Sequence, residues 1–267
     1  MSGVRNLVLV LGDQLSFDNP AFTGFDARRD RALMIEAPGE ATHVWSTKPR
    51  IAMFLAAMRH FAAEVRAKRW PIEYVALADA DAPTLRARLA ERLAALRPAH
   101  VIVCEPGEYR VLADVQDTCR AAGVPIDVRA DSHFLCSREA FAEWAAGYKS
   151  LRMELFYRTM RKRSGVLMDA AEPAGGTWNY DKENRAGFGR AGPGMIPAPP
   201  AIAPDAITRG VLDEVAPRFA AHPGSLAHFD WPVTRADALV WLDDFIAHRL
   251  AAFGPYQDAM WTDTPFA

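Results

Sequence analysis

The sequence predicts an α/β protein whose first 135 residues form a doubly wound, parallel five-stranded sheet. Five short segments of strand length are apolar at nearly every position, and segments with helical periodicity alternate with them. A strand that is apolar at nearly every position is covered on both faces of its sheet. The repeated alternation of strand and helix requires right-handed crossovers, which produce a parallel sheet with helices on both sides.

The predicted strands are 6–12, 31–37, 72–79, 100–106 and 125–131. A helix is expected after Pro49, where apolar residues recur at helical spacing as far as Val65. A second helix opens at Pro83 and stops before Pro98, as the positions of the two prolines predict. A further helix follows Glu108 and runs to residue 122. These helices supply the crossovers between the strands.

The strands are expected to cease after residue 135. Residues 136–203 are interpreted as an inter-domain connector, with two helices around Gly147 and then a long irregular stretch rich in glycine and proline. Helical patterns resume at 205–220 and 235–252. We assign 204–267 to the start of an all-α domain, and we expect this domain to be incomplete because the sequence stops soon after the second pattern.

Composition excludes several protein classes. The 267 residues are 50% hydrophobic and 24% charged, with a net charge of −2, which is typical of a globular protein and not of a disordered or collagen-like chain. Cys104, Cys119 and Cys136 cannot all pair and lack CxxC spacing, which favours a reduced, cytoplasmic location. The first apolar run is far shorter than the ~20 residues that span a bilayer, so we expect no membrane association.

The candidate ligand site lies at the end of the first strand, where Gly12, Asp13 and Gln14 follow the apolar run. Ligands of open α/β sheets bind in the crevice outside the carboxyl ends of the strands. Glycine lets a ligand approach the backbone, while the carboxylate and the amide offer hydrogen-bonding groups. An ordinary strand-terminating turn is the alternative. The sequence contains neither GxGxxG nor GxxxxGK[ST], so both common phosphate-binding loops are missing.

Glu36 and Glu40 are predicted on the same rim, at the end of the second strand. Three carboxylates around one crevice suit a polyol chain, a metal or an electron-poor ring, and a solvated rim is the alternative. Glu40 and His43 have metal-ligand spacing, but no second histidine follows nearby, so no metal site is predicted. Glu108 is a further candidate to line the same crevice, and capping of the helix that follows it is the alternative. Neither GxSxG nor HExxH occurs, and no catalytic residue is predicted.

A candidate DNA-binding segment combines basic and aromatic residues at 144–163 and 175–185. On a helix, Arg158, Arg161 and Lys162 fall opposite an apolar face. Basic side chains neutralise phosphates, and aromatic faces stack on exposed bases. A solvated helix face with a buried aromatic anchor explains the same residues without DNA.

Three sequence blocks carry a family resemblance: LGDQLS, WAAGYKSLRMELFYRTMRKRSGVLMD and P-x-GGTWNYDKENR. In order and spacing they resemble the bacterial iron–sulfur cryptochrome/photolyase-related proteins, the group that includes the prokaryotic (6-4) photolyases. The resemblance implies an α/β antenna domain at residues 1–135, followed by a helical domain that holds FAD and a [4Fe–4S] cluster. It also implies light-driven repair of ultraviolet photoproducts in DNA, or a photoreceptor role.

The resemblance further implies site residues. The antenna domain would bind 6,7-dimethyl-8-ribityllumazine, with Gly12, Asp13, Gln14 and Glu40 matching contact positions and Ile35 and Glu36 beside them. Arg158, Arg161, Lys162 and Arg185 would face DNA in the full-length protein.

The family expectation is therefore that the chain is the N-terminal, antenna half of a photolyase, with FAD and the [4Fe–4S] cluster held only by the full-length protein, so that the chain alone does not repair DNA. The alternative interpretation is a stand-alone α/β module that binds a small molecule or nucleotide and docks a partner through its C-terminal helices.

Overall fold

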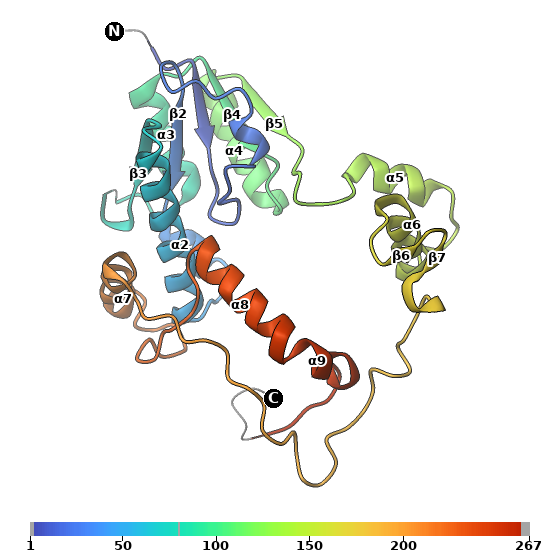
Figure 1. The fold of residues 1–267 in the computed structure, drawn as a ribbon. Coiled ribbons are helices and arrows are strands. Elements are labelled where there is room, and N and C mark those ends of the chain that lie inside the picture. The colour runs from blue at the N-terminus through green and yellow to red at the C-terminus, as the bar shows by residue number, and fades with distance from the viewer. Residues whose placement is uncertain (1–2, 80, 263–267) are drawn as a thin grey trace. The chain divides into compact units, whose positions relative to one another are not determined.

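The structure is a computed structural model that describes residues 3–79 and 81–262, and the chain folds into two compact units (Figure 1). The first unit contains the chain up to Ser132 together with Ile202–Arg235. The second contains His133–Ala201 together with residues 236–262. Within the described ranges, no helix is long and apolar enough to cross a membrane.

The first unit is built on a five-stranded sheet in which every neighbouring pair of strands is parallel. Its strands are β1 (Asn6–Leu9), β2 (Arg31–Ile35), β3 (Ile72–Val75), β4 (His100–Cys104) and β5 (Ile126–Arg129). Each strand lies inside its predicted segment, and the order β3-β2-β1-β4-β5 confirms the doubly wound fold. The chain winds outward in one direction from β1 to β3 and in the other from β4 to β5. The switch point between β1 and β4 is where such folds leave a crevice.

Both faces of the sheet are covered, as the continuous apolar pattern of its strands predicts. Successive side chains of β1 point to opposite faces, so Leu7 and Leu9 enter one core cluster while Val8 and Val10 enter another. The first cluster includes residues of α3 (Leu85–Leu96) and α4 (Tyr109–Ala122), and the second includes residues of α2 (Lys48–Ala67). Short helical turns at α1 (Pro38–Thr42), η1 (Pro20–Phe22) and η2 (Leu77–Asp79) complete the unit.

Helix α7 (Ala206–Arg218) packs against α2 and belongs to the sheet unit. Val211, Val215 and the following Phe219 form a buried stripe that shares a core cluster with Ile51 and Leu55 of α2. The domain boundary drawn at residue 204 in the sequence therefore differs from the structural division. Helical periodicity shows that one face of a helix is buried, but not which element covers that face.

The second unit contains α5 (Arg138–Ala146), α6 (Met153–Ser164), α8 (Arg235–His248) and α9 (Leu250–Tyr256). The expectation that strands cease after residue 135 is wrong in one place, because β6 (Met168–Asp169) and β7 (Glu172–Pro173) form a small antiparallel hairpin beside η3 (Ala174–Gly176). The irregular stretch after η3 is hydrogen-bonded to α8 and α9. The indole of Trp241 donates to the carbonyl of Pro200 at 2.7 Å, and the backbone N–H of Ala186 donates to the carbonyl of Pro255 at 3.0 Å.

An ion pair at the start of β1 gives the sheet unit a pH-dependent contribution to stability. Asp30 is buried and accepts hydrogen bonds from Arg5 Nε at 2.7 Å and from the backbone N–H of Asp26 at 2.8 Å. Burial alone would raise the pKa of Asp30, but hydrogen bonds from Arg5 and the backbone outweigh it and lower the pKa. The stabilisation is therefore present above the unfolded-state pKa of about 4 and is lost as the pH falls through the lower folded-state value.

We expect Asp30→Asn to lower the free energy of unfolding at neutral pH by about 1.5–3 kcal/mol, the usual range for hydrogen bonds to a charged group. The difference from the wild type should shrink as the pH falls from about 4, where Asp30 becomes protonated in the unfolded state, through the lower folded-state pKa, where it becomes protonated in the folded state as well. Urea denaturation across this pH range measures both effects, with Asp18→Asn as an exposed control. A difference between variant and wild type that stays constant down to about pH 2 contradicts the prediction.

Candidate functional site

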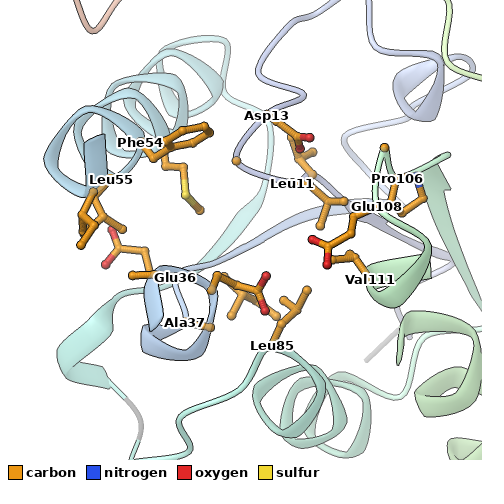
Figure 2. A pocket seen from close by; sticks show the side chains of 18 of the residues that line it. Leu11, Asp13, Glu36, Ala37, Phe54, Leu55, Leu85, Pro106, Glu108 and Val111 are labelled. Atoms are coloured by element: carbon orange, nitrogen blue, oxygen red, sulfur yellow. The ribbon is translucent and has the colours of Figure 1, made fainter. Parts of the chain in front are cut away.

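A cavity of about 290 Å³ opens where the chain leaves β1 and β2, at the carboxyl edge of the sheet (Figure 2). In the close-up, Phe54 and Leu55 lie on the α2 side, while Glu108 and Val111 lie on the α4 side. The lining includes Leu11, Gly12, Asp13, Ile35, Glu36, Ala37, Glu40, Arg50, Ile51, Phe54, Leu55, Met58, Leu85, Pro106, Gly107, Glu108 and Val111. The structure therefore brings five of the six predicted ligand residues to one cavity.

Gly12 allows the end of β1 to pass close to α2. A Cβ atom added at this position would lie 3.0 Å from Sδ of Met58 and 3.7 Å from Cδ1 of Phe54. Both of these side chains line the cavity. Any larger residue at position 12 would therefore compete with Met58 and Phe54 for the space that the cavity provides.

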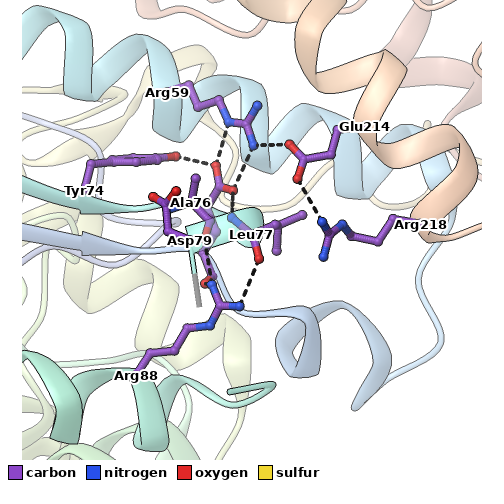
Figure 3. Close-up of polar contacts among 9 residues, drawn as sticks. Arg59, Tyr74, Ala76, Leu77, Asp79, Arg88, Glu214 and Arg218 are labelled. Carbon is purple, nitrogen blue, oxygen red and sulfur yellow. Dashed lines mark hydrogen bonds and ion pairs between the residues drawn. The ribbon is translucent and has the colours of Figure 1, made fainter. Parts of the chain in front are cut away.

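Glu36 is in the predicted place, but its carboxylate is fully engaged within the protein. Figure 3 labels the residues that donate to it, Arg59, Tyr74 and Leu77. Arg59 of α2 donates to its two oxygens at 2.8 and 2.9 Å, the hydroxyl of Tyr74 donates at 2.5 Å, and the backbone N–H of Leu77 donates at 2.8 Å. The Glu36 side chain is 0% exposed. Burial, reinforced by the charge of Glu36, raises the pKa of Tyr74, and the hydrogen bond to Glu36 raises that of Arg59. Glu36 therefore shapes the cavity wall, and its side chain is committed to structure.

The same network reaches α7 and α3. Arg59 also binds Glu214 at 2.6 Å, and Glu214 lies 3.4 Å from Arg218. Arg88 of α3, 1% exposed, donates to the carbonyl of Glu36 at 2.8 Å and to that of Leu77 at 3.1 Å. Sequence reasoning missed Arg59 and Arg88. The signal for Arg88 was its position in the apolar stripe of α3, between the buried Leu85 and Leu89.

Gln14 lies outside the cavity, unlike its predicted neighbours. Its side-chain amide donates to the carbonyl of Cys104 at 3.3 Å and to that of Glu105 at 3.0 Å, and the residue is only 3% exposed. Gln14 therefore ties the end of β1 to the end of β4 across the switch point. Gln14 thus holds the two strand ends beside the crevice and is not among the residues that line the cavity.

One guanidinium joins two of the three other carboxylates of the rim. Arg110 donates to Glu40 at 2.7 and 3.1 Å and to Glu108 at 2.7 Å, linking α1 to the start of α4. The hydrogen bond from Arg110 lowers the pKa of Glu108. Glu108 occupies the N-cap position of α4 without a side-chain capping bond, so the capping role considered for it is absent. Asp13, in contrast, is exposed on the lining.

The basic residues of α6 gather on one aromatic ring. The cationic groups of Arg158, Arg161 and Lys162 lie 5.4, 5.3 and 5.4 Å from the ring centre of Trp178. Arg161 is buried and also donates to the carbonyl of Leu167, while Arg158 pairs with Glu154. Lys162 and Arg185 are exposed. Arg158 and Arg161 are thus engaged within the protein, whereas Lys162 and Arg185 remain exposed.

Two of the three cysteines, Cys104 and Cys119, are not suited to reactive chemistry. Cys104 and Cys119 are buried in the sheet unit, and burial raises the pKa of each to about 11. A thiol with a raised pKa is a poor nucleophile and a poor metal ligand at neutral pH. Across the residues that the structure describes, no group of three or more histidine, cysteine, aspartate or glutamate side chains is arranged to hold a metal ion.

Comparison with known proteins identifies the relatives of this chain. Residues 8–231 match the family described as deoxyribodipyrimidine photo-lyase-related protein. A (6-4) photolyase of Agrobacterium fabrum (strain C58) is 42% identical over 264 residues, which are 98% of this chain and 52% of the relative. The chain thus spans about half the length of that curated relative. The family match covers most of the sequence, including the strands that build the cavity, and the chain belongs to the deoxyribodipyrimidine photo-lyase-related proteins.

Proposed function

We propose that this chain is the antenna part of a light-dependent DNA photolyase and that its cavity binds 6,7-dimethyl-8-ribityllumazine. The observation that carries the proposal is the cavity at the switch point, with Gly12, Asp13 and Glu40 on its lining. When bound, the lumazine would absorb violet light and pass its excitation energy to a flavin. The residues of this chain hold and orient the ligand and exclude water from its ring.

The lining fits a ligand with a planar ring and a neutral hydroxylated tail. Ile35, Phe54 and Met58 offer apolar surface to a planar ring, and the carboxylates of Asp13 and Glu40 accept hydrogen bonds from hydroxyl groups. The sequence contains neither of the common phosphate-binding loops, which favours lumazine over the alternative ligand, a nucleotide.

The DNA part of the proposal is supported by the similarity to a (6-4) photolyase. We propose repair of (6-4) photoproducts as the function of the whole protein, with DNA as its partner. Lys162 and Arg185 are the best placed of the predicted residues to meet phosphates, because they are exposed. FAD and the [4Fe–4S] cluster belong, in this proposal, to the full-length family member, and no described residue of this chain is assigned to either group.

Titration of the purified chain with 6,7-dimethyl-8-ribityllumazine tests the antenna proposal. We expect saturable binding of one molecule per chain, measured by the change in ligand fluorescence, and no displacement by ATP or NAD. The absence of lumazine binding, or efficient displacement by a nucleotide, would instead support the stand-alone nucleotide-binding module.

A further inference from the structure

Arg50 is the one cationic side chain among the described residues that line the cavity. The four carboxylates of the lining differ in how they are balanced. Glu36 is paired with Arg59, and Glu40 and Glu108 share Arg110. Within the described part of the chain, Asp13 and Arg50 form no ion pair and no side-chain hydrogen bond. The cavity therefore presents one uncompensated anion and one uncompensated cation to its contents.

Arg50 is held at the wall by an aromatic neighbour. Its guanidinium carbon lies 5.7 Å from the ring centre of Phe54, one turn further along α2. The start of this helix is fixed because the Thr47 side chain accepts a hydrogen bond from the backbone N–H of Arg50 at 3.4 Å. Arg50 is exposed, while Phe54 is half-buried and also lines the cavity. A planar ligand beside Phe54 would thus have a guanidinium at its edge.

Arg50 and Asp13 require opposite hydrogen-bonding groups on a ligand. A guanidinium only donates hydrogen bonds, whereas a carboxylate only accepts them. A complementary ligand carries carbonyl oxygens toward Arg50 and hydroxyl groups toward Asp13. A pteridinedione ring with a polyol tail has this combination, since its dione edge is rich in acceptors and its ribityl chain is rich in donors.

We propose that Arg50 is the specificity-determining residue of the cavity, which selects a ring with a dione edge and orients that edge toward the guanidinium. The inference rests on the proposed function, because it concerns the same ligand. It has a spectroscopic consequence. A cation beside a dione stabilises the ring that has lost its proton, so the bound ring should ionise about one to three pH units below the free ligand.

The test compares Arg50→Met and Arg50→Lys with the wild type, using 6,7-dimethyl-8-ribityllumazine as the probe. Arg66→Met is a matched control, because Arg66 lies on the same helix, is exposed and stands 5.8 Å over the ring of Tyr74, which does not line the cavity. We expect Arg50→Met to weaken binding about tenfold to a hundredfold, the range for a lost hydrogen bond to a charged group. Arg50→Lys should retain part of the affinity, and Arg66→Met should bind as the wild type does.

A pH titration of the absorbance of the bound ligand separates orientation from general damage to the cavity. The downward shift of ring ionisation should be present in the wild type and in Arg66→Met, and it should disappear in Arg50→Met. If Arg50→Met binds as tightly as the wild type and keeps the shift, the role of Arg50 is overturned while the antenna proposal stands. If the wild type binds no lumazine, the antenna proposal fails and the role of Arg50 fails with it.

Discussion

Arg59→Met should lower the free energy of unfolding of the sheet unit by about 3–5 kcal/mol, the usual cost of removing one partner from a buried ion pair. The carboxylate of Glu36 has no exposed surface and receives two of its four hydrogen bonds from Arg59. Methionine replaces the apolar stem of arginine but cannot balance the charge, and Glu214 loses the same partner. Urea denaturation followed by circular dichroism measures the loss.

Two further variants show whether the buried charge causes this loss. Arg120→Met breaks a pair whose side chains are 74% and 45% exposed, so it should change stability far less. Adding Glu36→Gln to Arg59→Met should recover part of the lost stability, because no unbalanced charge then remains in the interior. The explanation is wrong if the double variant is less stable than Arg59→Met, or if Arg120→Met is as damaging.

Gly12→Leu should abolish lumazine binding in the measured concentration range while the chain still folds. The added side chain must displace the end of Met58, which is flexible and borders the cavity. The loss in the free energy of unfolding from overpacking should therefore be near the lower end of the usual range, about 1 kcal/mol. The leucine side chain would occupy the part of the cavity that the ligand needs. Fluorescence titration measures the binding, and urea denaturation measures the stability.

Gly210→Leu provides the comparison for Gly12→Leu. Gly210 is exposed on α7, and a Cβ atom there would meet nothing within 4 Å apart from its chain neighbours and the adjacent backbone of its own helix. This variant should bind lumazine with unchanged affinity. Normal lumazine binding by Gly12→Leu contradicts the assignment of the ligand to this cavity, because the two cannot occupy the same volume.

The strands could be predicted because each one is marked by apolar residues at nearly every position of its own short segment. Leu7 and Val8 face opposite sides of β1 and are both buried, so the sequence itself records that both faces of the sheet are covered. The small hairpin could not be predicted in this way. Its strands have two residues each, and the turn between them uses Ala170 at φ +53, where glycine or asparagine is the usual signal.

The roles of the site carboxylates could be predicted only in part. The end of a parallel strand places Glu36 beside the crevice, and the structure agrees. Its engagement depends on Arg59, which is 23 residues away, and through Arg59 on Glu214, a further 155 residues along the chain. No local pattern contains such a pairing. For the same reason, the helical pattern of α6 could not predict that Arg161 is buried against Trp178.

The packing of α7 on α2 has a consequence for biosynthesis. The outer side of α2 cannot be covered until Phe219 has left the ribosome, long after the last strand of the sheet. At the usual rate of about 5–20 residues per second, the nascent protein spends several seconds with Ile51 and Leu55 uncovered. During this interval we expect the nascent chain to bind chaperones that cover exposed apolar surface.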